Sequence, residues 1–443
     1  KACQDPDGKY GNFFYLRDKK EDELPTNWRS YFGGPVWEDL PGTNKQYLHV
    51  FHKKQPDLNW ENPELREEVY KNINWWLDKG IDGFRMDVIN FISKWPSLPD
   101  GDPVVGKTLG FCGAEFYFYG PCLHAYLHEM NRNCFGRGDK EYVTVGECGG
   151  LGIETAKLTT ADTRQELSMV FNFDHLDNAG HMRFDEYQYD LRKAVKTILK
   201  WQVEYTNHCW PTLLFENHDN PRVTSKVDPT DTYTPEIAKL CAVLEMTLKG
   251  SPFIFQGQEL GMTNTHFDSM DDVRDVESIN FYNKLIAKGK KPEKALRIIN
   301  GGSRDHGRTP MQWTAEPGAG FTDGTPWIGI NKNAVRLNAA DEAKVPDSVL
   351  NDFKRLIALR HANPALVYGE FTQLCPENKN VVCYKRTLDG NTFFVELNLT
   401  GKRQNRPYDP AGFERLYSNY HDHRDVLMPF EANVYLAEGE AKA

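Results

Sequence analysis

The chain has 443 residues, of which 40% are hydrophobic and 12% aromatic, so it can bury a large core and divide into a main and a smaller domain. Its net charge of −10 is spread along the sequence, and no cluster of Lys and Arg is long enough to follow a phosphate backbone. A nucleic-acid partner is therefore not expected.

The first 62 residues are aromatic and irregular, with a turn signal at Phe32-Gly33-Gly34-Pro35, so we expect a lid-like excursion at residues 1–62. A helix is predicted at Pro63–Lys79, where apolar residues recur at steps of three and four and Asn62 is a good N-cap. The Trp75-Trp76 pair is expected to pack this helix against the sheet.

Strands and helices alternate after this point, which is typical of a parallel sheet. The predicted strands are Ile81–Asp87, Tyr142–Glu147, Leu167–Phe173, Thr212–Phe215 and Pro252–Phe255. The predicted helices are Cys122–Asn133, Ile153–Thr160, Tyr187–Thr206, Pro235–Leu248 and, after a polar loop-rich stretch, Asp347–Asn363. The alternation predicts an α/β fold of the (β/α)8 barrel type over residues 63–365.

Beyond Pro364 the pattern changes to β-rich stretches such as Val381–Thr387 and Thr392–Leu397, separated by Asp389-Gly390. A small antiparallel all-β domain at residues 366–443 is the simplest account of this change.

Three of the predicted strands lead into an acidic residue. Asp87 ends the segment Gly83-Phe84-Arg85-Met86-Asp87, Glu147 follows Gly146, and Asp219 ends Asn217-His218-Asp219. In a (β/α)8 barrel the working residues lie at the C-terminal ends of the parallel strands, so the three carboxylates are predicted to converge on one mouth. Three converging carboxylates suggest cleavage of a glycosidic bond.

The cysteines and the N-terminal sequence bear on location. Nine widely spaced cysteines form an odd set in a chain too large to need covalent cross-links. No apolar run approaches the ~20 residues of a membrane span, and the polar segment from Lys1 to Gly8 does not resemble a signal peptide. We therefore expect reduced thiols in a cytoplasmic protein with no membrane partner, as a monomer or weak oligomer.

Five motifs in order give the chain a family resemblance. They are Gln55–Asn59, Gly80–Asn90, Thr144–Glu147, Asn217–Asp219 and Arg308–Trp313. The sequence resembles glycoside hydrolase family 13, the α-amylase family, and most of all its oligo-1,6-glucosidase group. The resemblance implies a TIM barrel, a C-terminal β domain and an oligosaccharide substrate. No organic cofactor and no metal ion are expected.

The chain departs from the family at its beginning. Only five predicted strands alternate with helices, whereas a closed barrel needs eight. Family members begin with three βα units, including an Asp-x-x-x-Asn-His motif, and these are not matched here. We therefore expect a barrel truncated at its N-terminus, with strands 4–8 present, and an isolated chain that is unstable and weakly active.

The residue types also suggest roles. By strand periodicity Arg85 and Asp87 share a face, and a neighbouring guanidinium favours an ionised carboxylate, so Asp87 is the predicted nucleophile. Glu147 has no basic neighbour in its own strand, so a less polar wall can raise its pKa and make it the acid/base. The family gives the matching residues the same roles.

Four residues are candidates for substrate binding: Arg85, Val88, His218 and Arg308. His218 and Asp219 are expected to hold sugar hydroxyls. The resemblance implies that Arg308 lines the pocket for the terminal glucose. In this family Val after the nucleophile is typical of α-1,6-acting members, whereas Ala, Gly or Thr is typical of α-1,4-acting ones.

The sequence therefore predicts a retaining exo-α-glucosidase that releases α-1,6-linked, or alternatively α-1,4-linked, glucose from short oligosaccharides such as isomaltose. Trehalose-6-phosphate hydrolases and sucrose-active relatives remain alternatives, although Asn220–Val223 lacks the Arg-Leu-Asp-Arg type loop of sucrose isomerases. A non-catalytic amylase-like binding protein, or an inactive truncated product, is the alternative from another class. Asn220 and Gln258 stand where Gln and Glu are frequent in isomaltases, which bears on recognition of the leaving sugar.

Overall fold

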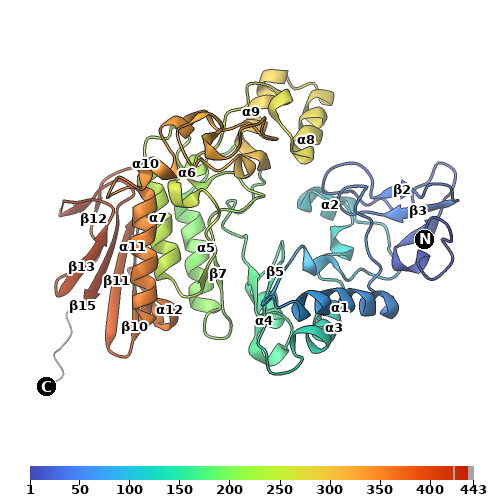
Figure 1. Ribbon diagram of the computed structural model, residues 1–443, viewed down its shortest axis with the longest axis horizontal. Helices are drawn as coiled ribbons and strands as arrows, with labels where there is room; N and C mark the ends of the chain where they lie inside the picture. Colours follow the sequence, from blue (N-terminus) through green and yellow to red (C-terminus); the bar gives the residue numbers. More distant parts are fainter. Residues whose placement is uncertain (423–424, 438–443) are drawn as a thin grey trace. The chain divides into compact units, whose positions relative to one another are not determined.

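The computed structural model describes residues 1–422 and 425–437 and divides the chain into two compact units, Lys1–Phe171 and Asn172–Ala443 (Figure 1). The last residues of the predicted C-terminal domain, 438–443, lie outside the described residues. Each unit contains a hydrophobic core of its own.

The first unit begins with a small antiparallel sheet in residues 1–62, which were expected to be irregular. Its strands are β1 (Leu16–Asp18), β2 (Trp37–Asp39) and β3 (Lys45–Leu48), in the order β1-β3-β2. Strands of three or four residues are too short to show a clear alternation of polar and apolar residues, so the sequence did not reveal them. An aromatic core that includes Trp28, Trp37 and Tyr117 lies in this unit.

The first long helix, α1 (Pro63–Asp78), begins as expected. The side chain of Asn62 accepts a hydrogen bond from the Glu64 N–H at 2.9 Å, and Pro63 occupies the first turn. Trp75 and Trp76 are 53% and 50% exposed, so the expectation that they pack the helix against the sheet is wrong. The buried side of α1 is formed instead by Leu65, Tyr70 and Leu77.

Three parallel strands follow in the order β4-β5-β6. They are β4 (Gly83–Met86), β5 (Val143–Glu147) and β6 (Met169–Phe171). The helices between them are α2 (Pro103–Leu109), α3 (Leu123–Met130) and α4 (Ile153–Thr160), with shorter turns η2 to η5. The chain leaves α3 through a π-helical turn, Asn131–Phe135, which explains why the predicted helix to Asn133 is longer than the α-helix observed.

Gly83 is required where β4 begins. Its φ is +156°, and a Cβ atom there would lie 1.7 Å from the carbonyl oxygen of Val143 on the neighbouring strand. Only glycine permits this close approach of β4 and β5.

The second unit has one short pair of parallel strands, β7 (Thr212–Leu213) and β8 (Ser251–Pro252). Its α-helices are α5 (Leu191–Glu204), α6 (Val223–Val227), α7 (Thr234–Thr247), α8 (Val276–Ala287), α9 (Pro292–Gly302), α10 (Ala339–Glu342), α11 (Val349–Ala362) and α12 (Pro364–Tyr368), with short turns η6 to η10. Helices α8 and α9 were not predicted. The sequence does carry a signal for α9. Pro292 stands at its start, and its buried residues Ala295, Ile298 and Ile299 follow a helical spacing.

An antiparallel sheet ends the chain, as the period-two pattern predicted. Its strands β9 (Glu370–Leu374), β10 (Val381–Leu388), β11 (Asn391–Asn398), β13 (Phe413–Ser418) and β15 (Ala432–Ala437) have the order β13-β15-β11-β10-β9, beside a separate pair β12 (Gln404–Asn405) and β14 (Val426–Leu427). Asp389 and Gly390 both have positive φ, the conformation that joins a tight hairpin between β10 and β11. One core runs from α5, α7 and α11 into this sheet.

All nine cysteines lie in the described part of the chain, and none of them forms a disulfide bond. None of the helices within residues 1–422 and 425–437 combines the length and the apolar character that crossing a membrane requires.

Helix α7 is buried along almost its whole length, and its buried side chains include one amine and one carboxyl group. Lys239 pairs with Asp352 at 3.0 Å. Glu245 is 1% exposed and accepts a hydrogen bond from Gln258 Nε2 at 2.8 Å. Burial raises the pKa of Glu245 from 4.5 to about 8. The folded protein therefore holds a proton at neutral pH that the unfolded chain releases.

We expect Glu245→Gln to make stability less dependent on pH. For the wild type, the free energy of unfolding should fall as pH rises from 4.5 to about 8, because only the folded state keeps the Glu245 proton over this range. The variant should escape a loss on the order of 4 kcal/mol. Denaturant unfolding at pH 5 and pH 9 measures the difference, with the exposed Glu293→Gln as control. Equal pH slopes for wild type and Glu245→Gln would contradict the burial argument.

Candidate active site

Strands β4 and β5 deliver two acidic residues to the same end of the sheet. The register pairs Met86 with Gly146, so Asp87 and Glu147 are the next residues on two adjacent parallel strands. Their environments differ, because the side chain of Asp87 is 71% exposed and that of Glu147 only 14%. The first unit therefore holds one solvated and one enclosed carboxyl group side by side.

The guanidinium of Arg85 connects these two groups. Its Nη1 donates to Asp87 Oδ1 at 2.5 Å, and its Nη2 donates to Glu147 Oε2. The contact with Asp87 was expected from strand periodicity. The contact with Glu147 was not, because Glu147 was expected to have no basic neighbour and that prediction considered its own strand alone.

Burial raises the pKa of Glu147 to about 7, while the charge of Arg85 acts in the opposite direction. A hydrogen bond and charge repulsion from Asp87 add to the increase. One carboxyl of the pair can thus hold a proton near neutral pH while the other stays exposed to water. This is the arrangement that separates an acid from a nucleophile in a two-carboxylate site.

Val88 has an unusual backbone. Its φ of 36° and ψ of 42° are left-handed, which is a strained conformation for a β-branched residue. In this conformation the Val88 N–H points at Glu147 Oε2, 3.4 Å away. The side chain is half-buried against the aromatic core of the first unit.

Two further residues shape the loops after these strands. A Cβ atom on Gly146 would lie 2.7 Å from Leu167 and 3.0 Å from Ile89, so glycine lets the strand bearing Glu147 pack tightly. Asn90, fully buried, donates from Nδ2 to the Gly149 carbonyl at 3.0 Å and ties the loop after β4 to the loop after β5. Sequence reasoning missed Asn90, although it lies within the Gly80–Asn90 motif.

Asp219 lies in the second unit, where other predicted residues surround it. Arg308 donates from Nη2 to Asp219 Oδ1 at 2.7 Å and from Nε to the His218 carbonyl at 2.8 Å. His218 Nε2 lies 3.1 Å from Asp219 Oδ2. Asn217 Oδ1 accepts hydrogen bonds from the Asp219 N–H at 2.9 Å and from Asn220 Nδ2 at 2.8 Å, which fixes the turn that carries Asp219.

Two arginines near Asp219 were not anticipated. Arg304 Nη1 donates to Asp219 Oδ1 at 3.3 Å, and Arg183 Nη1 donates to the Asp219 carbonyl oxygen. Arg304 stands four residues before Arg308, in the same turn, η8 (Arg304–Arg308), which was a usable signal. Nothing in the local sequence marks Arg183.

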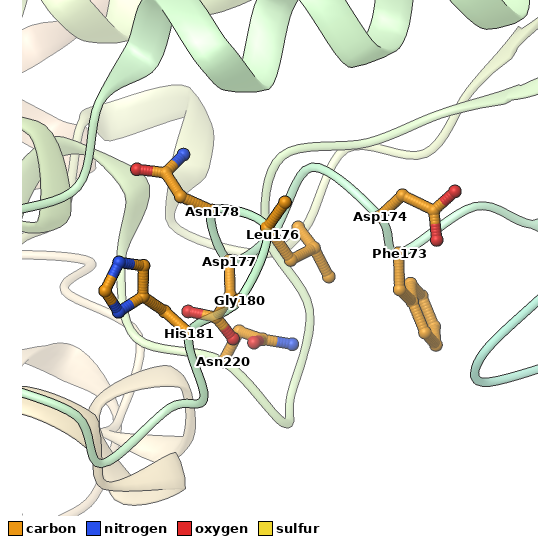
Figure 2. A pocket seen from close by; sticks show the side chains of 9 residues that line it. Phe173, Asp174, Leu176, Asp177, Asn178, Gly180, His181 and Asn220 are labelled. Carbon is orange, nitrogen blue, oxygen red and sulfur yellow. The ribbon is translucent and has the colours of Figure 1, made fainter. Parts of the chain in front are cut away.

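A pocket of about 330 Å³ lies beside Asn220, the residue after Asp219 (Figure 2). The loop after β6 forms most of its wall through Phe173, Asp174, Leu176, Asp177, Asn178, Ala179, Gly180 and His181. Figure 2 labels Asp177 and Asn220 among the side chains that line the pocket. The lining is polar, with two carboxylates and two amides, and contains neither Lys nor Arg.

The structure thus brings Arg85, Asp87, Val88 and Glu147 together in the first unit, and His218, Asp219 and Arg308 together in the second. That the two groups form one mouth stays a prediction. Within the described part of the chain, no group of three or more His, Cys, Asp and Glu side chains is arranged to hold a metal ion.

Comparison with known proteins identifies the family. The model of the alpha-amylase catalytic domain matches residues 1–369. The chain is 40% identical to an oligo-1,6-glucosidase of Halalkalibacterium halodurans, covering 98% of this chain and 79% of that protein.

Solved structures agree. A trehalose-6-phosphate hydrolase of Bacillus licheniformis superposes with a TM-score of 0.87 at 36% identity, covering 99% of this chain and 80% of that one. An isomaltulose synthase of Erwinia rhapontici NX5 gives 0.89 at 35% identity, covering 98% and 79%. The expected truncation of the barrel is not confirmed and stays a prediction. The chain belongs to the alpha-amylase family of glycoside hydrolases, with that family's TIM-barrel catalytic domain followed by a C-terminal antiparallel sheet.

Proposed function

We propose that the chain is a retaining exo-α-glucosidase that releases terminal α-1,6-linked glucose from short oligosaccharides such as isomaltose. The observation that carries this proposal is the pair formed by exposed Asp87 and enclosed Glu147 on one guanidinium, with burial raising the pKa of Glu147 to about 7. The similarity to a protein named oligo-1,6-glucosidase supports the substrate.

In the proposed reaction Asp87 attacks the anomeric carbon while Glu147 gives its proton to the glycosidic oxygen, so that the leaving sugar departs and a glucosyl ester forms on Asp87. Glu147, now ionised, takes a proton from water. The water oxygen attacks the anomeric carbon, the ester bond breaks and Asp87 is restored. Two inversions give net retention.

The remaining residues are assigned to substrate binding. Asp219 and His218 hold ring hydroxyls, and the bonds from Asp219 strengthen as positive charge develops on the sugar. We propose that Arg308 contributes to the pocket for the terminal glucose. We also propose that the chain is divided as the sequence predicts, into a lid at residues 1–62, a barrel at 63–365 and a C-terminal domain at 366–443. No organic cofactor takes part in this reaction.

Trehalose-6-phosphate hydrolysis is the second candidate, because a hydrolase named for that substrate has a similar structure. The pocket beside Asn220 argues against it. Asp174 and Asp177 line this pocket, and its lining holds His181 but no Lys or Arg, so the two carboxylates would repel a phosphate dianion bound there. Comparing kcat/KM for isomaltose, maltose, sucrose and trehalose 6-phosphate tests the proposal. A preference for the phosphorylated sugar would replace it by the second candidate.

Azide should separate the roles of the two acids. Asp87→Ala should lose at least about 10³-fold in kcat, and azide should restore turnover by occupying the vacated space and yielding the β-glucosyl azide. Glu147→Ala should lose about 10²–10⁴-fold on isomaltose but much less on a dinitrophenyl α-glucoside, whose leaving group needs no proton.

Asp82→Asn is the matched control, because Asp82 precedes the same strand β4 and its side chain is 86% exposed. It should leave activity unchanged. If azide rescued the Glu147 variant and gave the β-glucosyl azide, the roles of the two acids would be reversed. If azide did not rescue the Asp87 variant, its assignment as nucleophile would be removed.

The pH dependence follows from Glu147. Because the acid must be protonated, kcat/KM on isomaltose should fall about tenfold per pH unit above about 7. Arg85→Gln removes the charge that lowers the pKa of Glu147, so the alkaline limb of the kcat/KM profile should move to higher pH while kcat drops. The limb of Arg85→Lys should lie between those of the wild type and Arg85→Gln. Initial rates from pH 5 to 9 measure the limb. A limb that moves to lower pH in Arg85→Gln would contradict the assignment of the acid.

Val88 should determine the linkage preference. Val88→Ala or Val88→Thr removes bulk or apolar character beside Asp87, and should raise the ratio of kcat/KM for maltose over isomaltose by about 10–200-fold. Val104→Ala, at a position 73% exposed on α2, is the control and should leave the ratio unchanged. An unchanged ratio in both Val88 variants would refute this role.

A further inference from the structure

The contacts of Asp219 extend beyond Arg308. Arg304, whose side chain is 12% exposed, reaches Asp219 with Nη1 and reaches Asp275 Oδ1 with Nη2 and Nε at 2.5 and 2.9 Å. It therefore connects a proposed substrate-binding carboxylate to a second carboxylate that lies deeper in the protein.

Asp275 is held in a fixed position. Its side chain is fully buried, and as the N-cap of α8 its Oδ2 accepts hydrogen bonds from the N–H and Oγ of Ser278 at 3.1 and 2.7 Å. Burial alone would raise the pKa of Asp275, but the hydrogen bonds and charge of Arg304 outweigh it and hold this pKa below its ordinary value. The carboxylate therefore stays charged, and Arg304 is held at that end.

Arg183 makes a second connection of the same kind. Its Nη1 donates to the carbonyl oxygen of Asp219 and its Nη2 donates to Glu277, which lies in the first turn of α8. Glu277 Oε2 also lies 3.5 Å from Arg304 Nε. Two arginines thus tie the backbone and the side chain of Asp219 to one end of a single helix.

The turn that bears Arg304 also fits closely against the Asp219 loop. A Cβ atom on Gly307 would lie 2.9 Å from the Asn217 carbonyl oxygen and 3.1 Å from that of Asn220. Glycine therefore allows η8 to touch the backbone on both sides of Asp219. The loop has little room to shift without breaking these contacts.

We infer that Arg304 and Arg183 are positioning residues, which fix the Asp219 carboxylate against the N-terminus of α8 without touching the substrate. The inference rests on the proposed role of Asp219. With Arg308 and Arg304 on Oδ1 and His218 on Oδ2, the plane of the carboxylate is set and its remaining lone pairs point where a sugar hydroxyl can donate. A carboxylate set in this way does not need to reorganise as charge develops in the transition state.

A double-mutant cycle separates positioning from mere stability. Arg304→Gln in the otherwise wild-type chain should lower kcat/KM on isomaltose about 100-fold, the cost of a ~1 Å misplacement. In the Asp219→Asn background the same change should cost less than about 3-fold, because the group it positions has already lost its charge. Arg304→Lys should recover part of the loss. Equal losses in both backgrounds, or no loss in either, would overturn the inference.

Three further measurements separate the positioning role from a loss of folding and from a failure of the proposed function. Arg304→Gln combined with Asp275→Asn removes both buried charges, so no carboxylate is left without its partner, and it should show the same kinetic loss. Arg297, on α9, forms an exposed ion pair with Glu186, and Arg297→Gln should leave kcat/KM unchanged. If the wild type cleaves no α-glucoside, the proposed function fails on its own. A crystal structure of Arg304→Gln then decides the inference, since an Asp219 carboxylate that keeps its orientation would overturn it.

Discussion

One guanidinium determines the chemistry of the first unit. Arg85 holds Asp87 and Glu147 together, and it does so from the strand that leads into Asp87. Two carboxyl groups this close repel each other when both are ionised, so without a cation one would stay protonated well above its usual range. The cation limits that effect. It leaves Glu147 with a pKa near neutrality, where one group can both donate and accept a proton.

Both units use the same means to hold an acidic residue still. In each case a glycine makes room for close packing: Gly146, next to Glu147, for the side chains of Leu167 and Ile89, and Gly307 for the backbone of the Asp219 loop. An arginine then bridges carboxylates from different elements, Arg85 in one unit and Arg304 in the other. Precision therefore comes from close packing first and from charge second, since ion pairs with long flexible side chains fix a position only when their stems are confined.

The sequence predicted what depends on short-range periodicity. Alternation along a strand placed Arg85 and Asp87 on one face, and the antiparallel C-terminal sheet followed from period-two runs joined by Asp389-Gly390. The ends of predicted strands supplied Glu147 and Asp219 as candidates and the family resemblance supplied Arg308, but periodicity could not reveal their partners.

What escaped prediction depends on contacts between distant segments. Arg183 and Arg304 lie 36 and 85 residues from Asp219, and no local pattern encodes such a meeting. The prediction that Trp75 and Trp76 pack α1 against the sheet is wrong for another reason. Apolar character alone did not show which side of α1 is buried, because Tyr70 and Leu77 occupy that side and leave the two indoles outside.

The left-handed backbone of Val88 sets folding stability against the shape of the side chain next to Asp87. A β-branched residue in this conformation costs on the order of 1–3 kcal/mol of folding free energy, which Asn or Gly would largely recover. Selection for thermal stability alone would therefore drift toward Asn or Gly at residue 88. A change of Val88 to Asn or Gly would therefore exchange the branched side chain next to Asp87 for folding stability, so stability and the shape of this part of the site are coupled at one residue.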